Sequence, residues 1–413
     1  MLRLLALLLS LCQAHILSGR ALPQIPMMLP EPTPDKLFRL KDKEGDRPLT
    51  LVEPLQKGLK TFLSSKGDPI AAVVLAEVQS GKILAMVQGK DPKSWGAEQH
   101  TALHPGFPAA SLFKIPTTVA ALELQVKSDY SLPLFGGCGE VRTQSMLLHD
   151  TALSKRRARL TSLSTAFADS CNNFYASMAL QRVGLGPILD VANHMGWGEQ
   201  NLSADFEVSG SPLLPPTATH SDIRDVGRYA AGFGPAGLSP AHGAWLSLMI
   251  ANHGEPTPLV LFADTARVPL AYTSKPIYSQ KTGTELLEMM QKTVRSGTAA
   301  GVFKNRLYRK FRLDAGGKTG TLKSVSPEGL GTWFIGLYPV SAPKVVVSAV
   351  VVNSDRWVIK GSQLAAEALR QWYDFQHREA TIVIKPTIKS KSPLSKSPLK
   401  SRNAATSVTA PKV

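Results

Sequence analysis

Four stretches of the chain are almost continuously apolar. IAAVVLAEV (70–78) and KILAMV (82–87) are joined by the turn-forming residues 79–81, and this spacing predicts a β-hairpin. GTWFIGLY (331–338) and KVVVSAVVV (344–352) are separated by a turn that contains Pro and Ser. Their length and composition predict two further strands, buried and adjacent to each other.

Elsewhere, apolar residues recur at intervals of three and four, which indicates helices. One of these helices follows a capping-box pattern formed by Thr282 and Glu285. Strands therefore come first and last, with helices between them, which predicts one sheet built from both ends of the chain around a helical insertion. The expected helices cover residues 51–64, 111–126, 160–183 (as one or two helices), 240–252, 285–296 and 361–376.

Both ends of the chain differ in composition from its middle. Residues 1–21 begin with a cation, Arg3, and a leucine-rich run, which is typical of a secretory signal peptide; an uncleaved membrane anchor is the alternative. We thus expect an exported protein of the periplasm or cell envelope, associated with the membrane if the signal is retained. Residues 22–49 are rich in Pro and charge and predict an extended linker, 50–376 form the folded domain, and 377–413 predict a basic, disordered tail.

The composition narrows the class of protein. With 43% apolar and 19% charged residues, the 413-residue chain is neither wholly disordered nor fibrous. Its formal net charge is +16, and residues 385–413 contain basic residues but no acidic ones. We expect this tail to be a solvated end without a partner, and electrostatic contact with an anionic envelope surface is the alternative. Nucleic acid is not an expected partner, because the chain has no motif that binds RNA or DNA.

Cysteine and histidine patterns say little about the site. Outside the predicted signal, Cys138 and Cys171 either form one disulfide in an oxidising compartment or remain thiols. No CxxC, HExxH or clustered His pattern occurs in the sequence. We therefore expect no metal site and no cofactor.

Three short motifs with reactive side chains occur in order along the chain. A serine stands at the start of an apolar helix with a lysine one turn later, so that the two side chains lie on the same face. Taken alone, this serine is more typical of a helix cap than of a nucleophile, and only the three motifs together reverse that interpretation. The motifs are Ser111-Leu112-Phe113-Lys114 (S-x-x-K), Ser170-Cys171-Asn172 (S-x-N) and Lys318-Thr319-Gly320-Thr321 (K-T-G-T).

Each motif also has a second copy, which the context excludes. The S-x-x-K at Ser397 and the S-x-N at Ser401 lie in the Pro- and Lys-rich tail, where no buried site is expected and where they follow every K-T-G. The K-T-G at Lys281 leads directly into a helix, so the hydroxyl of Thr282 is expected to cap that helix. The segment that contains Lys318 comes before a buried strand. This position is typical of an edge strand that lines a cleft.

Together and in this order, the motifs resemble the active-site set of penicillin-binding proteins and serine β-lactamases. The likeness extends over residues 50–376, which look like a penicillin-binding transpeptidase domain of the serine β-lactamase and D,D-peptidase superfamily. It implies an α/β (α+β) fold with a mainly antiparallel sheet flanked by helices, and an all-helical lobe beside it. The active site is expected between the sheet and the lobe.

The resemblance assigns a role to each motif residue. The catalytic residues are a nucleophile, a base and a hydroxyl that passes the proton to the leaving amine. The remaining side chains bind a peptide-like substrate and its carboxylate, and two backbone N–H groups complete an oxyanion hole. The catalytic set is Ser111, Lys114 and Ser170, the substrate-binding set is Asn172, Lys318, Thr319 and Thr321, and the oxyanion donors are the N–H groups of Ser111 and Thr321.

The proposed base, Lys114, can act only if the folded structure lowers its pKa. A serine hydroxyl requires a base within hydrogen-bond reach, and Lys114 serves only when it is neutral. From a reference pKa of about 10.4, neutralising a lysine at pH 7 costs about 4.6 kcal/mol. Burial and a second cation lower this cost. We therefore expect the amino groups of Lys114 and Lys318 near the same hydroxyl.

The resemblance implies acyl transfer from the D-Ala-D-Ala end of peptidoglycan stem peptides and covalent capture of β-lactams. The first hypothesis is an exported D,D-transpeptidase; a D,D-carboxypeptidase or a serine β-lactamase is the alternative, and a β-lactam sensor or wall-binding module is the alternative without catalysis. An intact motif set argues against an idle site. The sequence lacks the E-x-x-L-N pattern that positions a deacylating water, which favours a long-lived acyl-enzyme.

Overall fold

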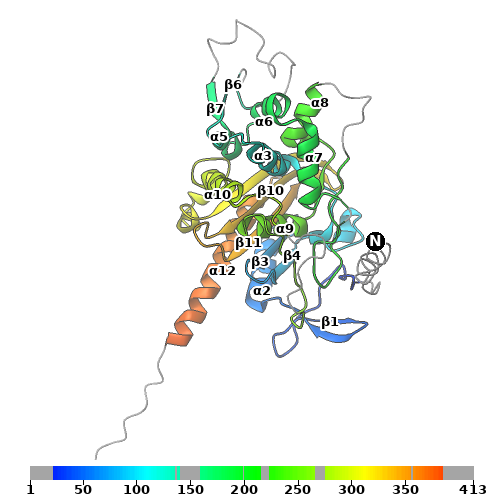
Figure 1. The fold of residues 1–413 in the computed structure, drawn as a ribbon. Helices are drawn as coiled ribbons and strands as arrows, with labels where there is room; N and C mark the ends of the chain where they lie inside the picture. The colour runs from blue at the N-terminus through cyan, green and yellow to red at the C-terminus, as the bar shows by residue number, and fades with distance from the viewer. Residues whose placement is uncertain are drawn as a thin grey trace, which may run out of the picture. The chain divides into compact units, whose positions relative to one another are not determined.

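A five-stranded antiparallel sheet lies at the centre of the computed structural model (Figure 1), with strand order β4-β3-β11-β10-β9. The hairpin and the buried strand pair predicted from the sequence are confirmed. The structure describes residues 22–134, 137–139, 159–198, 200–214, 223–265, 275–354 and 357–384. The strands of the sheet are β3 (Ile70–Glu77), β4 (Ile83–Gln88), β9 (Gly316–Val325), β10 (Glu328–Tyr338) and β11 (Val345–Asn353).

Helices cover both faces of this sheet, and strand β11 is buried along its whole length. Val347 of β11 packs in one apolar cluster with Leu59 of α2 and Leu369 of α12. Val346 faces the other side and packs in a second cluster with Trp245 of α9. The alternation follows from the two-residue period of a strand. The longer helices are α2 (Glu53–Ser64), α3 (Lys114–Glu123), α7 (Leu185–His194), α9 (Pro240–Ala251), α10 (Gln280–Arg295) and α12 (Gly361–Ile384).

The segment between β4 and β9 supplies the predicted helical lobe. In this lobe α3 packs against α7, α6 against α8, and α5 against α10. Two short ladders, β5 with β8 and β6 with β7, connect its loops. The further elements are η3 (Ala110–Phe113), β5 (Phe107–Pro108), β6 (Ser131–Leu134), β7 (Arg159–Ser162), α5 (Leu163–Ala168), α6 (Asn172–Met178), η5 (Ala179–Val183), α8 (Ile223–Arg228), η7 (Tyr229–Phe233), β8 (Gly237–Leu238) and α11 (Ala300–Phe303).

The segment expected as an extended linker, residues 22–49, is in fact part of the folded unit. Strands β1 (Arg39–Asp42) and β2 (Gly45–Pro48) pair in an antiparallel hairpin. Phe38 is 2% exposed, and Ile25 packs in the same core cluster. The linker prediction was wrong because it weighed Pro and charge, whereas a few apolar side chains secure the segment to the core.

Two boundaries also differ from the prediction. Residues 159–162 form strand β7, where the sequence predicted the start of a helix. Helix α10 begins at Gln280, because the hydroxyl of Ser279 caps it by accepting the N–H of Thr282 at 3.3 Å. The predicted capping role of Thr282 is therefore wrong.

The structure describes both ends of the chain only in part. The predicted signal, residues 1–21, and the basic residues 385–413 lie outside the described residues. Residues 377–384, expected to begin a disordered tail, continue helix α12. Among the described residues, no helix has the length and apolar character needed to cross a membrane.

The packing of the N-terminal segment predicts a stability effect. Replacing Phe38 with Ala should lower the free energy of unfolding by about 3 kcal/mol, because a buried aromatic side chain is removed from the core. Its neighbour Leu37 is 38% exposed, and Leu37→Ala is the matched control, expected to change stability by less than about 0.5 kcal/mol. Urea unfolding followed by fluorescence measures both variants. Equal, small effects would mean that residues 22–49 do not contribute to the core.

Candidate active site

Ser111 lies in the 3₁₀ turn η3, directly before helix α3. Its neighbours in η3, Ala110 and Leu112, are buried, whereas Ser111 is half-buried. Ala110 has a φ of +50°, a left-handed conformation that costs energy for a residue with a Cβ. Such strain persists where the surrounding structure determines the backbone, and it is common at functional sites.

A glycine in η7 allows η3 to be packed in this way. Gly232 has a φ of +91°, and a Cβ placed on it would lie 2.1 Å from the carbonyl oxygen of Ala110. No other residue leaves this space. The backbone of Ser111 is therefore held against η7 by direct contact.

The amino group of Lys114 is the centre of the site. Its side chain is completely buried, and Nζ lies 2.7 Å from each of three oxygens, Ser111 Oγ, Asn172 Oδ1 and the carbonyl oxygen of Ala231. None of these partners is a carboxylate. A neutral amine has two N–H groups and one lone pair, so it donates to Asn172 and Ala231 and accepts the hydroxyl proton of Ser111.

The electrostatics favour this neutral form. Burial lowers the pKa of Lys114 well below its usual value of 10.5, and the positive charge of Lys318 lowers it further. Both effects act against a second positive charge in an enclosed site. The structure therefore provides the conditions expected from the sequence, because burial and a second cation both lower the pKa of the lysine beside the serine.

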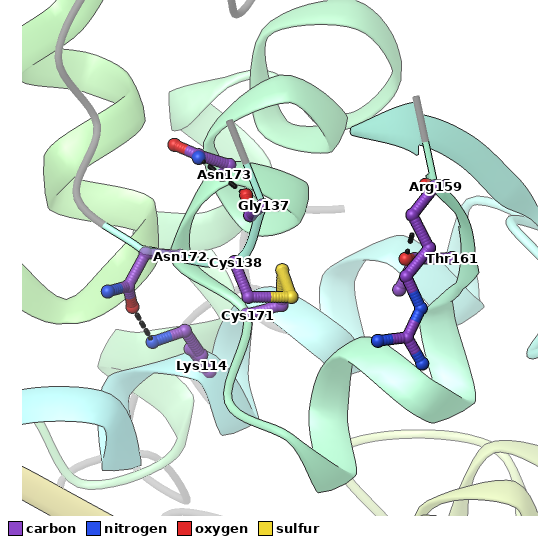
Figure 2. Close-up of a disulfide and its surroundings, with 8 residues drawn as sticks. All are labelled: Lys114, Gly137, Cys138, Arg159, Thr161, Cys171, Asn172 and Asn173. Carbon is purple, nitrogen blue, oxygen red and sulfur yellow. Dashed lines mark hydrogen bonds between the residues drawn. A yellow bond between two sulfur atoms is a disulfide. The ribbon is translucent and has the colours of Figure 1, made fainter. Parts of the chain in front are cut away.

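The S-x-N motif lies in the turn between α5 and α6 (Figure 2). Asn172 is the first residue of α6, and its side chain points to Lys114. Ser170 is half-buried and has a φ of +55°, again a left-handed conformation. Cys171, between them, forms a disulfide with Cys138, so the pairing left open by the sequence is resolved.

The K-T-G motif lies on β9, which is the edge strand that the sequence predicted. The side chain of Lys318 is completely buried, its Nζ donates to the carbonyl of Thr319 at 3.0 Å, and burial lowers its pKa to about 7. A Cβ on Gly320 would lie 3.4 Å from the Cβ of Ala110. Strand β9 therefore runs directly beside the turn that carries Ser111.

The two lysines are coupled electrostatically. The positive charge of Lys318 repels the proton on Lys114, and burial lowers the pKa of each lysine. The site therefore disfavours two positive charges at once.

The structure brings most of the predicted residues together. Ser111, Lys114 and Asn172 are in direct contact, and Lys318 is close enough to affect Lys114. We find no hydrogen bond between the Ser170 hydroxyl and another described side chain. On β9, the half-buried Thr319 and the exposed Thr321 follow Lys318.

Two contributions to the site were not predicted. The carbonyl of Ala231 accepts from Lys114, and a backbone group gives no signal in a sequence. Thr298 lies 2.5 Å from the hydroxyl of Thr319, oxygen to oxygen, and also bonds the carbonyl of Ala168. Its position shortly before the K-T-G motif, in RSGTAAG, was the available signal.

The second copies of the motifs do not form a site within the described residues. Lys281 is exposed on α10, and the hydroxyl of Thr282 donates to the carboxylate of Glu123. The copies at Ser397 and Ser401 lie outside the described residues.

Comparison with known proteins now identifies the family. The family profile described as "Penicillin binding protein transpeptidase domain" matches residues 71–374, and the chain belongs to this family. No curated protein matches the sequence.

Several solved structures share the fold. The D,D-transpeptidase domain of a peptidoglycan glycosyltransferase from Eggerthella lenta is 20% identical, with a TM-score of 0.60 over 79% of this chain and 82% of that one. Penicillin-binding protein A from M. tuberculosis, as a penicillin G acyl-enzyme complex, is 22% identical, with a TM-score of 0.57 over 80% of each chain. PBP2 of Pseudomonas aeruginosa in complex with WCK 5153 is 18% identical, with a TM-score of 0.60 over 79% of this chain and 78% of that one. At these identities the likeness establishes the fold.

The burial of Lys318 predicts a pH dependence of stability. The unfolded chain binds this proton more tightly than the folded one, so the free energy of unfolding should rise with pH between about 7 and 10.5. From pH 6.5 to 9.5 the contribution is about 3 kcal/mol. In Lys318→Met this part of the rise should disappear, and the variant should be more stable than the native protein at pH 6.5.

Lys323→Met is the matched control, because Lys323 is an exposed lysine on the same strand. Urea unfolding at both pH values measures all three proteins. If Lys318→Met and Lys323→Met show the same pH dependence as the native protein, Lys318 is not a buried amine.

Proposed function

We propose that this chain is an exported serine D,D-transpeptidase that cross-links peptidoglycan through an acyl-enzyme on Ser111 and is acylated by β-lactams. The observation that supports it most strongly is the hydrogen bond between the hydroxyl of Ser111 and the buried amine of Lys114, whose pKa is lowered by burial and by Lys318. Membership of the penicillin-binding transpeptidase family supports the same reaction class. The predicted signal over residues 1–21 supports export.

Acylation begins with proton transfer. Ser111 Oγ attacks the carbonyl carbon of the penultimate D-Ala while Lys114 Nζ accepts the hydroxyl proton. The ammonium that forms donates to three acceptors already in place, Ser111 Oγ, Asn172 Oδ1 and the carbonyl of Ala231. Since these groups need not reorganise, they stabilise the charge as it develops.

The oxyanion of the tetrahedral intermediate requires two donors. Ser111 N–H lies in the first turn of η3, where N–H groups have no partner within the helix. Thr321 lies on the edge strand β9, which leaves a row of N–H groups without a neighbouring strand. These two N–H groups form the oxyanion hole in the proposed mechanism, and loss of one such donor costs about 3 kcal/mol.

The remaining motif residues bind the substrate and protonate the leaving group. The proton that Lys114 took from Ser111 passes through the hydroxyl of Ser170 to the departing D-Ala amine, which leaves Lys114 neutral again, while the amide of Asn172 holds the peptide. Lys318 supplies positive charge, and the hydroxyls of Thr319 and Thr321 donate to the terminal carboxylate. Thr298 orients Thr319 through its hydroxyl.

The acceptor determines the product. An amine from a second stem peptide attacks the ester on Ser111. Lys114 takes the proton of this amine and gives it to Oγ as the ester bond breaks, which restores the hydroxyl of Ser111 and the neutral lysine. In a β-lactam the amide bond breaks in the same way, but the amine stays tethered to the acyl group, so the ester persists. The penicillin G acyl-enzyme of M. tuberculosis penicillin-binding protein A has a related fold and supports this proposal for β-lactams.

The first experiment labels the purified protein with a fluorescent penicillin and locates the adduct by mass spectrometry. We expect a stable acyl group on Ser111 that is absent in Ser111→Ala. In Lys114→Ala the acylation rate should fall by about 10²–10⁴-fold, because the general base is lost. Lys281→Ala removes the lysine of the exposed K-T-G copy and should label normally.

The same preparation tests the acceptor. A donor peptide ending in D-Ala-D-Ala is incubated with and without a D-amino acid as the amine. Exchange of the terminal D-Ala for the added amine is the expected result. Release of D-Ala by water alone would identify a carboxypeptidase, and labelling at Ser397, or none in a folded protein, would overturn the proposed site.

A further inference from the structure

A disulfide joins the middle residue of the S-x-N motif, Cys171, to a second segment of the chain (Figure 2). It joins Cys138, in the segment 137–139, to Cys171, the residue between Ser170 and Asn172. Cys171 is completely buried, whereas Cys138 is half-buried between the exposed Gly137 and Gly139. One sulfur of the bond is therefore held in the core, and the other lies nearer to solvent.

Two hydrogen bonds join the same two segments. The N–H of Asn172 donates to the carbonyl of Cys138 at 3.1 Å, and the side chain of Asn173 donates to the carbonyl of Gly137 at 2.7 Å. The segment 137–139 contains two glycines, which do not by themselves hold one conformation. Between this segment and the turn, the disulfide is the covalent tie.

The turn joined by this disulfide contains a residue in a left-handed conformation. Ser170 is held at a φ of +55°, which a residue with a Cβ adopts only where its surroundings impose it. The next residue is the bonded Cys171, and the one after that is Asn172, whose Oδ1 accepts from Lys114 at 2.7 Å. The bonded Cys171 is thus the immediate neighbour in sequence of Asn172, a direct partner of the proposed base.

We propose that the Cys138–Cys171 disulfide is a positioning element for Asn172, and that its reduction by a dithiol slows the acylation of Ser111 while the fold is retained. This proposal rests on the proposed function. In the folded protein the disulfide fixes the amide of Asn172 against Lys114 Nζ. With the bond broken, the turn relaxes, and the amide no longer holds the amine in line with Ser111.

The reduction is an ordinary thiol–disulfide exchange. A thiolate of the dithiol attacks the more accessible sulfur of Cys138 and expels the thiolate of Cys171. The second thiol of the reagent then closes on the mixed disulfide and releases Cys138. Two electrons and two protons pass to the protein, which gains two thiols, and the reagent becomes a cyclic disulfide. Oxidation by a disulfide reagent reverses the change.

The test measures acylation by a fluorescent penicillin over a range of concentrations, with the native protein oxidised and reduced. We expect reduction to lower the limiting acylation rate about tenfold, the effect of losing roughly one hydrogen bond in the transition state. The half-saturating concentration should change by less than about threefold, because the disulfide positions the base more than it binds the substrate. Circular dichroism confirms that the reduced protein is folded.

Two variants make the result specific. Cys138→Ala with Cys171→Ala should acylate as slowly as the reduced native protein, and the dithiol should have no further effect on it. In Asn172→Ala, which acylates slowly by itself, reduction should change the rate by less than twofold, because the disulfide acts through the missing amide. If the variant with both cysteines replaced does not fold, the effect of reduction on the acylation rate can still be compared between the native protein and Asn172→Ala.

The outcomes separate the two proposals. Equal limiting rates before and after reduction would overturn the positioning role, and so would an undiminished effect of the dithiol on Asn172→Ala. The proposed function would survive both results as long as the oxidised protein is labelled on Ser111. An oxidised, folded protein that is not labelled would overturn both.

Discussion

The site depends on the buried amine of Lys114, whose three oxygen partners include no carboxylate. An ammonium inside a folded chain is costly unless a negative charge accompanies it, and among the described residues the hydrogen-bond partners of Lys114 are three uncharged oxygens. The positive charge of Lys318 adds to the cost. Release of the proton is the least costly response, and it converts Lys114 into a base beside the hydroxyl of Ser111.

The fold creates this enclosure from distant parts of the chain. The helical insertion supplies η3 and α3 with Ser111 and Lys114, and the C-terminal strands supply Lys318. Strand β10 is joined to the approach of η3 by a hydrogen bond from the indole N–H of Trp333 to the carbonyl of Pro108, at 2.9 Å. The absent side chain of Gly320 then allows β9 to lie against Ala110. Packing of this kind excludes water, which is what lowers the pKa of both lysines.

The sequence predicted what local geometry and pattern determine. Continuous apolar runs gave the strands, and the three-residue spacing gave the contact between Ser111 and Lys114. The approach of Lys318 to Lys114 was expected from the lowered pKa that the base requires, and the family resemblance placed Asn172 at the site as a substrate-binding residue. Spacing along the chain alone does not show which segments approach one another. The bond between Cys138 and Cys171 spans 33 residues and was left open for the same reason. The burial of Phe38 was missed because a single apolar residue among prolines and charges has no periodic pattern.

The protonation state of Lys114 is open to direct measurement. Lysine labelled with ¹⁵N at Nζ gives distinct NMR signals for an amine and an ammonium, and the signal of Lys114 is assigned by its loss in Lys114→Met. In a pH titration this nitrogen should lose its proton well below the usual lysine pKa of 10.5, since burial and Lys318 both lower its pKa. An ammonium signal for Lys114 that persists up to that usual value would contradict its role as the base that activates Ser111.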